Sequence, residues 1–413
     1  MTKNSFLAAG LLSALCLPAR AVEYVPMVNL SLIGGQYFFA GDKSHLNANL
    51  MANVTPAVKF DNGWTVLPTY SGYFRGTKSV TDSVGAGTLF QQMMDHRGSL
   101  TGIYAVPDTD WKLKPNCSYK FEFMKESNDE EWGKGLFDYG KIGLGFEAEK
   151  VYRDPFSIRL AYDMYWIYFP HYNSLESKSG VDPSGDPLGR ELAGTKVLNT
   201  FNKQFTVTAS RPYPYDDPVV SLQGSYSFLW QIFKDQPLVD EAGRYLRRRR
   251  EDYGQTVNLS VTYPRSFKGD SLRLNSSFQT GLIYIGSNQN TYDAGQTKYV
   301  PDAYSYTTVL WGPSLNLSWG DKKKPQSAGL SFLWSRTQYS GRLAQDGSGL
   351  YTADCQHQNR YLLSLGYGYP VADHFRLTAN TNFLWATSNQ QFQATYKYTY
   401  NAANYFLGFT YDY

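Results

Sequence analysis

Cysteine and charge are both scarce in this sequence. Its 413 residues include 3 cysteines, and Asp, Glu, Lys and Arg together make up 18% of the chain. Without the closely spaced Cys and His residues of zinc, haem or iron–sulfur sites, we expect no metal and no cofactor. The formal net charge of +3 is close to balance, so the composition predicts no nucleic-acid partner.

Long apolar runs are also missing. Beyond the N-terminus, no segment supplies the roughly 18 consecutive apolar residues that a membrane helix requires. The mean hydropathy is negative, yet aromatic residues reach 16% and Tyr alone occurs 34 times, which is unusual for a soluble protein. Strands that expose only every second residue to lipid would explain both observations.

The N-terminus has the features of a secretory signal peptide. Lys3 lies in a short polar start, an apolar run covers residues 6–17, and Ala19 and Ala21 have the spacing that a signal peptidase recognises. We therefore expect residues 1–21 to be a cleaved signal peptide and residues 22–413 to be the exported domain.

Apolar and polar residues alternate through much of the remaining chain. Along residues 111–123, one face reads Trp, Leu, Pro, Cys, Tyr, Phe, Phe and the other reads Lys, Lys, Asn, Ser, Lys, Glu. Residues 156–168 and 220–232 repeat this pattern. A period of two predicts strands, because on a helix the charges would surround the axis. Each segment exceeds the 9 to 11 residues, roughly, of a tilted transmembrane strand.

We predict an all-β fold, an antiparallel up-and-down barrel of about 16 strands, with a range of about 14 to 18. The strands are expected to begin near residues 28, 46, 64, 90, 110, 137, 156, 197, 219, 253, 270, 303, 327, 358, 374 and 401. Every second connection is short, whereas the others are long and polar, notably 170–196, 234–252 and 340–357. This asymmetry is typical of outer-membrane barrels, whose short turns are periplasmic. A large soluble β-sandwich would not require it.

Aromatic residues cluster beside the short turns and at the C-terminus. A girdle at the periplasmic lipid interface is expected from Phe60, Trp64, Trp111, Phe156, Tyr263, Trp319, Tyr369 and Phe375. The last strand alternates Phe409, Tyr411 and Tyr413 with polar or small residues. It resembles the C-terminal signature of outer-membrane barrel proteins, and the strand layout resembles porins of the 16-strand type. This resemblance implies recognition by the barrel-assembly machinery.

The two cysteines of the exported domain are not expected to form a disulfide. Cys117 falls on the predicted lipid face and Cys355 in a distant surface loop.

The predicted inner face contains charged positions that could line a pore. The basic ones are Lys59, Arg75, Arg97, Lys112, Lys114, Lys120, Lys141, Arg159, Arg273, Arg360 and Arg376. The acidic ones are Asp95, Glu122, Glu147, Glu149, Asp163 and Asp412. The basic surplus would favour anion passage. Alternatively, these charges pair across neighbouring strands and only keep the wall wetted.

Residues 234–252 form an unusual predicted loop. Pro237 and acidic residues come early, and Arg247, Arg248, Arg249 and Arg250 come last, an order that predicts a short helix complementing its dipole. The loop could fold inward and constrict the pore. It could instead bind lipopolysaccharide phosphates, for which arginine is suited, or be a solvated charge run.

No catalytic site is predicted. His171 is the only histidine expected near a serine at the outer rim, Ser174, and this spacing does not resemble that of barrel phospholipases. Asp182 and Asp186 could bind calcium, but their Gly- and Pro-rich surroundings are more typical of turns.

The sequence therefore predicts a bacterial outer-membrane channel for passive diffusion of small hydrophilic solutes, with a weak anion preference. The alternative is a non-conducting surface barrel whose loops bind a partner or lipopolysaccharide. The expected partners are outer-membrane lipid, lipopolysaccharide, the barrel-assembly machinery and small solutes, and no oligomeric state is predicted.

Overall fold

The structure is a computed structural model. It describes residues 23–40, 45–76, 79–81, 88–90, 92–125, 130–151, 156–174, 192, 194–214, 219–267, 271–293, 295–321, 324–393 and 397–413. The predicted signal peptide, residues 1–21, lies outside these ranges, as do Asp182 and Asp186. Within them, no helix is long and apolar enough to cross a membrane.

One antiparallel sheet contains 18 strand segments. Their bounds are β1 Glu23–Val25, β2 Val28–Phe39, β3 His45–Val54, β4 Ala57–Lys59, β5 Trp64–Arg75, β8 Gln92–Ala105, β9 Trp111–Lys125, β10 Tyr139–Lys150, β11 Ser157–Tyr168, β14 Thr200–Pro214, β15 Val219–Val239, β16 Tyr245–Phe267, β17 Leu272–Ser287, β20 Tyr306–Gly320, β21 Pro325–Gln345, β22 Tyr351–Pro370, β23 Phe375–Ser388 and β24 Tyr400–Asp412. Because β1 leads into β2 and β3 into β4, the sheet has 16 continuous strands, as predicted.

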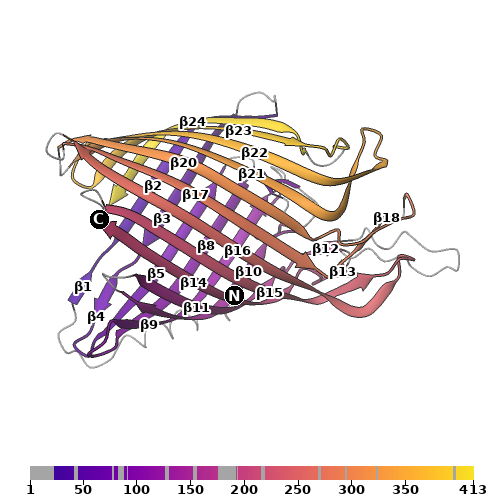
Figure 1. Cartoon of the computed structure of the whole chain (residues 1–413), viewed down its shortest axis with the longest axis horizontal. Helices are drawn as coiled ribbons and strands as arrows, with labels where there is room; N and C mark the ends of the chain where they lie inside the picture. Colours follow the sequence, from indigo (N-terminus) through magenta and orange to yellow (C-terminus); the bar gives the residue numbers. More distant parts are fainter. Residues whose placement is uncertain are drawn as a thin grey trace.

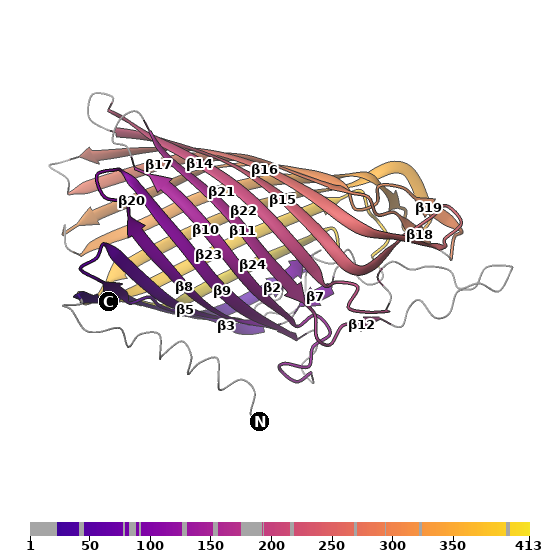
Figure 2. The ribbon, with the colours of Figure 1, turned by 90° about the horizontal axis from the view of Figure 1, so that it is seen from below.

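The sheet closes on itself. Each strand pairs with the next along the chain, and β24 pairs with β2 from Asn29–Asp412 to Phe39–Ala402. Figures 1 and 2 show the strands running obliquely around one barrel, with the C-terminus at the end that carries the short turns. Closure leaves no sheet edge whose backbone groups would lie unpaired in lipid.

Among the described residues, three small hairpins lie between barrel strands. They are β6 Ser79–Thr81 with β7 Thr88–Phe90, β12 Asn173–Ser174 with β13 Gly194–Thr195, and β18 Thr291–Asp293 with β19 Lys298–Val300.

The outer face of the barrel is apolar. Leu46 and Leu407 are 84% and 72% exposed, and residues that pair across neighbouring strands keep the same character, such as Tyr162 with Phe146 and Phe205. Exposed leucine and aromatic side chains over a whole wall indicate a surface made for lipid.

Aromatic rings gather at both ends of this apolar band. Beside the short turns, Trp64 stacks on Tyr104 and Phe375 on Phe409. At the opposite end, Trp166 lies against Phe201, Trp230 against Tyr253, and Trp311 against Trp334. Rings with one apolar and one polar side favour the two lipid–water interfaces.

Two hairpins extend the wall beyond the membrane and correct the predicted loops. The segment 234–252 is not a loop with a helix, because β15 continues to Val239 and β16 begins at Tyr245. Asp240 makes the turn between them by accepting hydrogen bonds from the backbone N–H groups of Ala242 and Arg244, at 3.0 and 2.8 Å. Residues 340–357 likewise belong largely to β21 and β22 rather than to a loop.

Buried amides join these projecting segments. The Gln289 side chain donates to the Pro237 carbonyl oxygen at 2.8 Å, and Gln390 donates to Gln345 at 3.0 Å. Gln236 and Gln289 are completely buried. The rim beyond the membrane is therefore built from strands that hydrogen-bond to one another rather than from separate loops.

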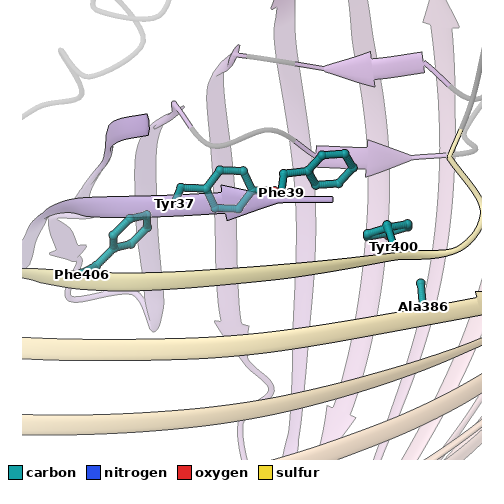
Figure 3. Packing of buried hydrophobic residues seen from close by; sticks show 5 residues of the cluster. All are labelled: Tyr37, Phe39, Ala386, Tyr400 and Phe406. Atoms are coloured by element: carbon teal, nitrogen blue, oxygen red, sulfur yellow. The ribbon is translucent and has the colours of Figure 1, made fainter. Parts of the chain in front are cut away.

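A small aromatic core lies inside the wall near the closing seam. Tyr37 and Phe39 of β2, Ala386 of β23, and Tyr400 and Phe406 of β24 are each less than 9% exposed and point to the same side of the sheet (Figure 3). These residues are in register with inward positions, so apolar packing thickens the wall where the first and last strands meet.

Candidate functional site

The pairing register places the charged positions named above on one face of the sheet. Lys112 pairs with Glu149, which pairs with Arg159, and Lys120 pairs with Arg97 and Lys141. The same inward face carries Lys59, Arg75, Lys114, Glu122, Glu147, Asp163, Arg273, Arg360 and Arg376. It is the face opposite to the exposed leucine and aromatic side chains.

One ion-pair network lies on β9, β10 and β11. The Lys114 Nζ lies 2.6 Å from both Glu147 and Glu149, and Arg159 lies 3.4 Å from each of the same carboxylates. Two cations thus share two acids across three strands. These four side chains together carry no net charge.

A second network lies further along the same strands. Lys120 forms ion pairs with Glu122 and with Asp95, the latter at 3.4 Å. The Tyr139 hydroxyl donates to Glu122 at 2.8 Å and accepts from Lys120 at 3.1 Å. The lysine is therefore held against the wall by two acids and one phenol.

Other cations on this face lie close to aromatic or polar groups. The Lys141 Nζ lies 3.6 Å from the centre of the Tyr165 ring, and the Arg75 guanidinium lies 5.4 Å from that of Tyr73. Arg376 donates to the Ser327 hydroxyl at 3.0 Å. Within the described ranges, Arg97 of β8 and Lys141 of β10 form no ion pair.

Gly145 allows one close approach across this wall. It pairs with both Asn116 and Asp163, whose side chains hydrogen-bond to each other in front of it. An added Cβ would lie 2.2 Å from the Asp163 carboxylate, so any side chain here would push the pair apart.

Two inward acids were missed from the sequence. Glu23 of β1 forms an ion pair with Lys59 at 3.1 Å, and Asp252 of β16 binds Arg250 at 2.6 Å. Glu23 precedes the first predicted strand, which begins near residue 28. Asp252 ends the predicted loop 234–252, although its alternation with Gly254, Thr256 and Asn258 favours a place on the strand.

The four consecutive arginines do not act as one group. Arg247, Arg248 and Arg249 are exposed on the projecting part of β16, whereas Arg250 is buried. Alternation along a strand puts Arg247 and Arg249 on one face and Arg248 and Arg250 on the other. In the predicted helix all four would lie in the last turn.

Inside the outer mouth lies a cavity of about 320 Å³. It reaches from Tyr139 on β10 to Arg342 on β21 and includes Arg250 and Asp252. Its wall positions Thr200, Phe233, Ile285, Tyr306 and Tyr339 are inward in the pairing register.

The C-terminal residues Phe409, Tyr411 and Tyr413 lie at the seam. Phe409 and Tyr411 pair with Leu32 and Leu30 of β2. The Tyr413 N–H donates to the Val28 carbonyl oxygen at 2.8 Å, and the Val28 N–H donates back at 2.9 Å. The last residues therefore take part in closing the barrel.

The residues considered for other chemistry are dispersed. His171 is exposed, and Cys117 and Cys355 are free thiols, with Cys355 on β22 rather than in a loop. No three His, Cys, Asp or Glu residues of the described ranges form a group that could hold a metal ion.

No protein-family model and no curated protein sequence matches this chain. Solved structures with a similar fold include a bacterial polysaccharide outer membrane secretin, with 10% identity, a TM-score of 0.44, and coverage of 94% of this chain and 98% of that one. OccD3 of Pseudomonas aeruginosa has 9% identity and a TM-score of 0.45, with 94% and 91% covered.

A variant of the porin from Rh. blastica has 10% identity and a TM-score of 0.34, with 94% and 100% covered. At these identities the likeness concerns the fold alone.

Proposed function

We propose that this chain is an outer-membrane channel for the passive diffusion of small hydrophilic solutes. The supporting observation is the closed wall of 16 strands whose inner face carries charged and polar side chains over its whole circumference. Barrels of this strand number leave a lumen wide enough for water and solutes. Export through the signal peptide and assembly through the C-terminal strand belong to the same proposal.

A weak preference for anions is part of the proposed function. The network around Lys114 balances its own charges, and over the whole inner face the basic positions, Arg97 and Lys141 among them, outnumber the acidic ones. Basic side chains along a wet pore attract anions.

Single-channel recording in planar bilayers tests the channel. Folded protein should give stepwise increases in current, and the same amount of heat-denatured protein in the same detergent should give none. If correctly folded protein shows no steps, the channel is wrong and the surface-barrel alternative stands.

The second candidate is a barrel whose outer rim binds lipopolysaccharide. It is favoured by the exposure of Arg247, Arg248 and Arg249 on the projecting part of β16, since guanidinium groups pair well with phosphates. In a triple alanine variant that keeps Arg250, stabilisation by lipopolysaccharide-containing bilayers should be lost. A shifted reversal potential with unchanged stability would instead assign these arginines to the pore.

A further inference from the structure

A groove of about 360 Å³ lies on the lipid-facing side of the wall. It crosses β14, β15, β16 and β17, which are neighbours in the barrel (Figure 1). Ala209 of β14 pairs with Gly224 of β15, and these two small residues leave space on the surface. Beside them, Leu222 and Leu259 are 41% and 54% exposed. The groove is therefore a dent in the apolar face of the barrel, bordered by large side chains.

Arg211 lies at one end of this groove. It pairs with lipid-facing Leu222 and is exposed, so its side chain is on the outside of the barrel. β14 ends at Pro214, at the end of the barrel that carries the short turns. The guanidinium is therefore close to the lipid–water interface of the periplasmic leaflet, where an arginine on the lipid face costs little.

The charge of Arg211 is not neutralised by an acid within the described part of the chain. The one interaction of its guanidinium there is with the Tyr213 ring, whose centre lies 4.7 Å away. A ring face orients a cation but leaves its charge in place. The described lining of the groove contains no other charged side chain. An anionic group at this end of the groove would balance the charge.

A phospholipid combines the two kinds of chemistry that this site can contact. A guanidinium pairs with a phosphate through parallel hydrogen bonds. An acyl chain in the groove would make van der Waals contacts with Leu222, Leu259 and Phe278, all of which line it. Because all surrounding lipid is equally apolar, the phosphate contact decides which lipid is held and in which orientation.

The missing acid also favours one class of headgroup. A zwitterionic lipid would place its ammonium group near Arg211, and the described lining offers that group no carboxylate. A lipid with a net negative headgroup avoids this repulsion between like charges.

We propose that this groove binds one anionic phospholipid of the periplasmic leaflet. The Arg211 guanidinium pairs with the phosphate, and one acyl chain lies over Ala209 and Gly224. The site goes beyond the proposed function, because it is on the outside of the barrel and requires no conductance.

Native mass spectrometry of the folded protein in detergent micelles tests the site. The probes are phosphatidylglycerol, phosphatidylethanolamine and phosphatidylcholine with the same acyl chains. One phosphatidylglycerol should stay bound, with a dissociation constant at least about tenfold lower than that of either zwitterionic lipid.

A matched pair of arginine variants separates the site from general attraction of anions. Arg211→Gln should raise the dissociation constant of phosphatidylglycerol at least about tenfold. Arg265→Gln is the control, since Arg265 also faces lipid, in register with Leu274, and lies 4.9 Å from the centre of the Tyr263 ring, but does not line the groove. It should leave the dissociation constant unchanged.

A second pair of variants tests the groove itself. Ala209→Phe keeps Arg211 and fills the groove with a ring, so it should also weaken binding, and it serves if Arg211→Gln does not fold. Ala328→Phe, at a position of β21 that pairs with lipid-facing Tyr367 outside the groove, should have no effect.

Three results would overturn the site: equal affinity for the three lipids, wild-type affinity in both Arg211→Gln and Ala209→Phe, or an equal loss of affinity in Arg265→Gln. A dimer that dissociates in Ala209→Phe, without any lipid preference, would instead assign the groove to a second copy of this chain and likewise reject the lipid. Absence of current steps would reject the channel and leave these measurements unaffected.

Discussion

Asp346 shapes the tip of the hairpin formed by β21 and β22. Its Oδ1 accepts hydrogen bonds from the Ser348 hydroxyl at 2.6 Å and from the backbone N–H groups of Ser348 and Leu350, at 2.9 and 3.1 Å. Gly349 takes a φ of +89°, which lets the chain turn back. Asp240 organises the turn between β15 and β16 in the same way.

Replacing Asp346 with alanine should loosen this tip. The hydrogen bond from the Ser348 hydroxyl, followed by the backbone donors, lowers the pKa of Asp346 from its usual range. A carboxyl with a depressed folded pKa stabilises the turn above its unfolded pKa and loses this contribution as pH falls through the folded pKa. The Leu350 amide should therefore exchange hydrogen faster in the variant, and the wild type should approach the variant as the pH falls below about 4.

Hydrogen exchange followed by mass spectrometry, corrected for intrinsic rates, measures this effect. The control is Asp354→Ala, which removes an exposed carboxylate of β22 and should not change exchange at the tip. Equal exchange in wild type and Asp346→Ala at neutral pH would contradict the assigned role.

Breaking the ion pair of Arg250 and Asp252 should lower the free energy of unfolding. Their side chains are only 11% and 7% exposed, so Asp252→Leu leaves a buried cation without its acid. We expect a loss of about 3–5 kcal/mol in the free energy of unfolding, measured by urea titration. The double variant Arg250→Met/Asp252→Leu should recover most of it, because it removes both buried charges. A double variant as unstable as the single one would show that shape rather than charge is decisive.

At the scale of elements, alternation along each strand decides what lipid and lumen meet. β11 shows this within two residues, since Tyr162 pairs with Phe146 and Phe205 while Ala161 pairs with Glu147 and Thr206. A slip of one residue would exchange the two faces.

An arginine substitution on β11 should therefore be tolerated on the lumen face and not on the lipid face. Tyr162→Arg places a charge in the apolar band near the middle of the strand and should cost about 2–4 kcal/mol of folding free energy. Ala161→Arg places the same charge beside Glu147 and should cost little. Urea titrations of folding into phosphatidylcholine vesicles compare the two, and a larger loss for Ala161→Arg would reject this register.

Strand pairing also explains why the predicted helix in 234–252 is wrong. The helix prediction depends only on the local order of proline, acids and arginines. The same order is compatible with a hairpin. The ladder between β15 and β16, resumed after a register shift at Pro237–Arg249, satisfies backbone groups that an isolated helix end would leave open.

For the whole molecule, the charge distribution predicts modest selectivity. Over the whole inner face the basic positions, Arg97 and Lys141 among them, outnumber the acidic ones, although the network around Lys120 contains two acids and one lysine. The screening length is about 10 Å at 0.1 M salt and about 3 Å at 1 M, so the preference should fade as salt rises.

Reversal potentials in a KCl gradient measure this selectivity. The wild type should favour chloride slightly, and the double variant Arg97→Gln/Lys141→Gln should reduce the preference. Lys324→Gln, at a periplasmic turn where Lys324 pairs with Asp373 at 2.8 Å, is a control outside the lumen. A wild-type channel that favours potassium would contradict the electrostatic argument.

The sequence by itself determined the strands, their number and their two faces. These follow from a period of two and from turn residues, which are local properties that each segment carries alone. The alternation of Tyr119 and Phe121 with Lys120 and Glu122 is legible without any partner strand. The same logic placed the charged positions on one face, because only one register keeps the apolar residues toward lipid.

Only the tertiary structure decided what those positions contact. The ion pairs of Lys114 and Lys120 depend on how far neighbouring strands are staggered, which no single strand encodes. At the outer mouth, an alternating column of rings and guanidinium groups joins segments far apart along the chain, namely Phe233, Arg250, Tyr304, Arg342 and Tyr339. Barrel closure and the register shifts in β15–β16 and β21–β22 bring them together. Such proximity follows from long-range pairing and curvature, and a local pattern contains neither.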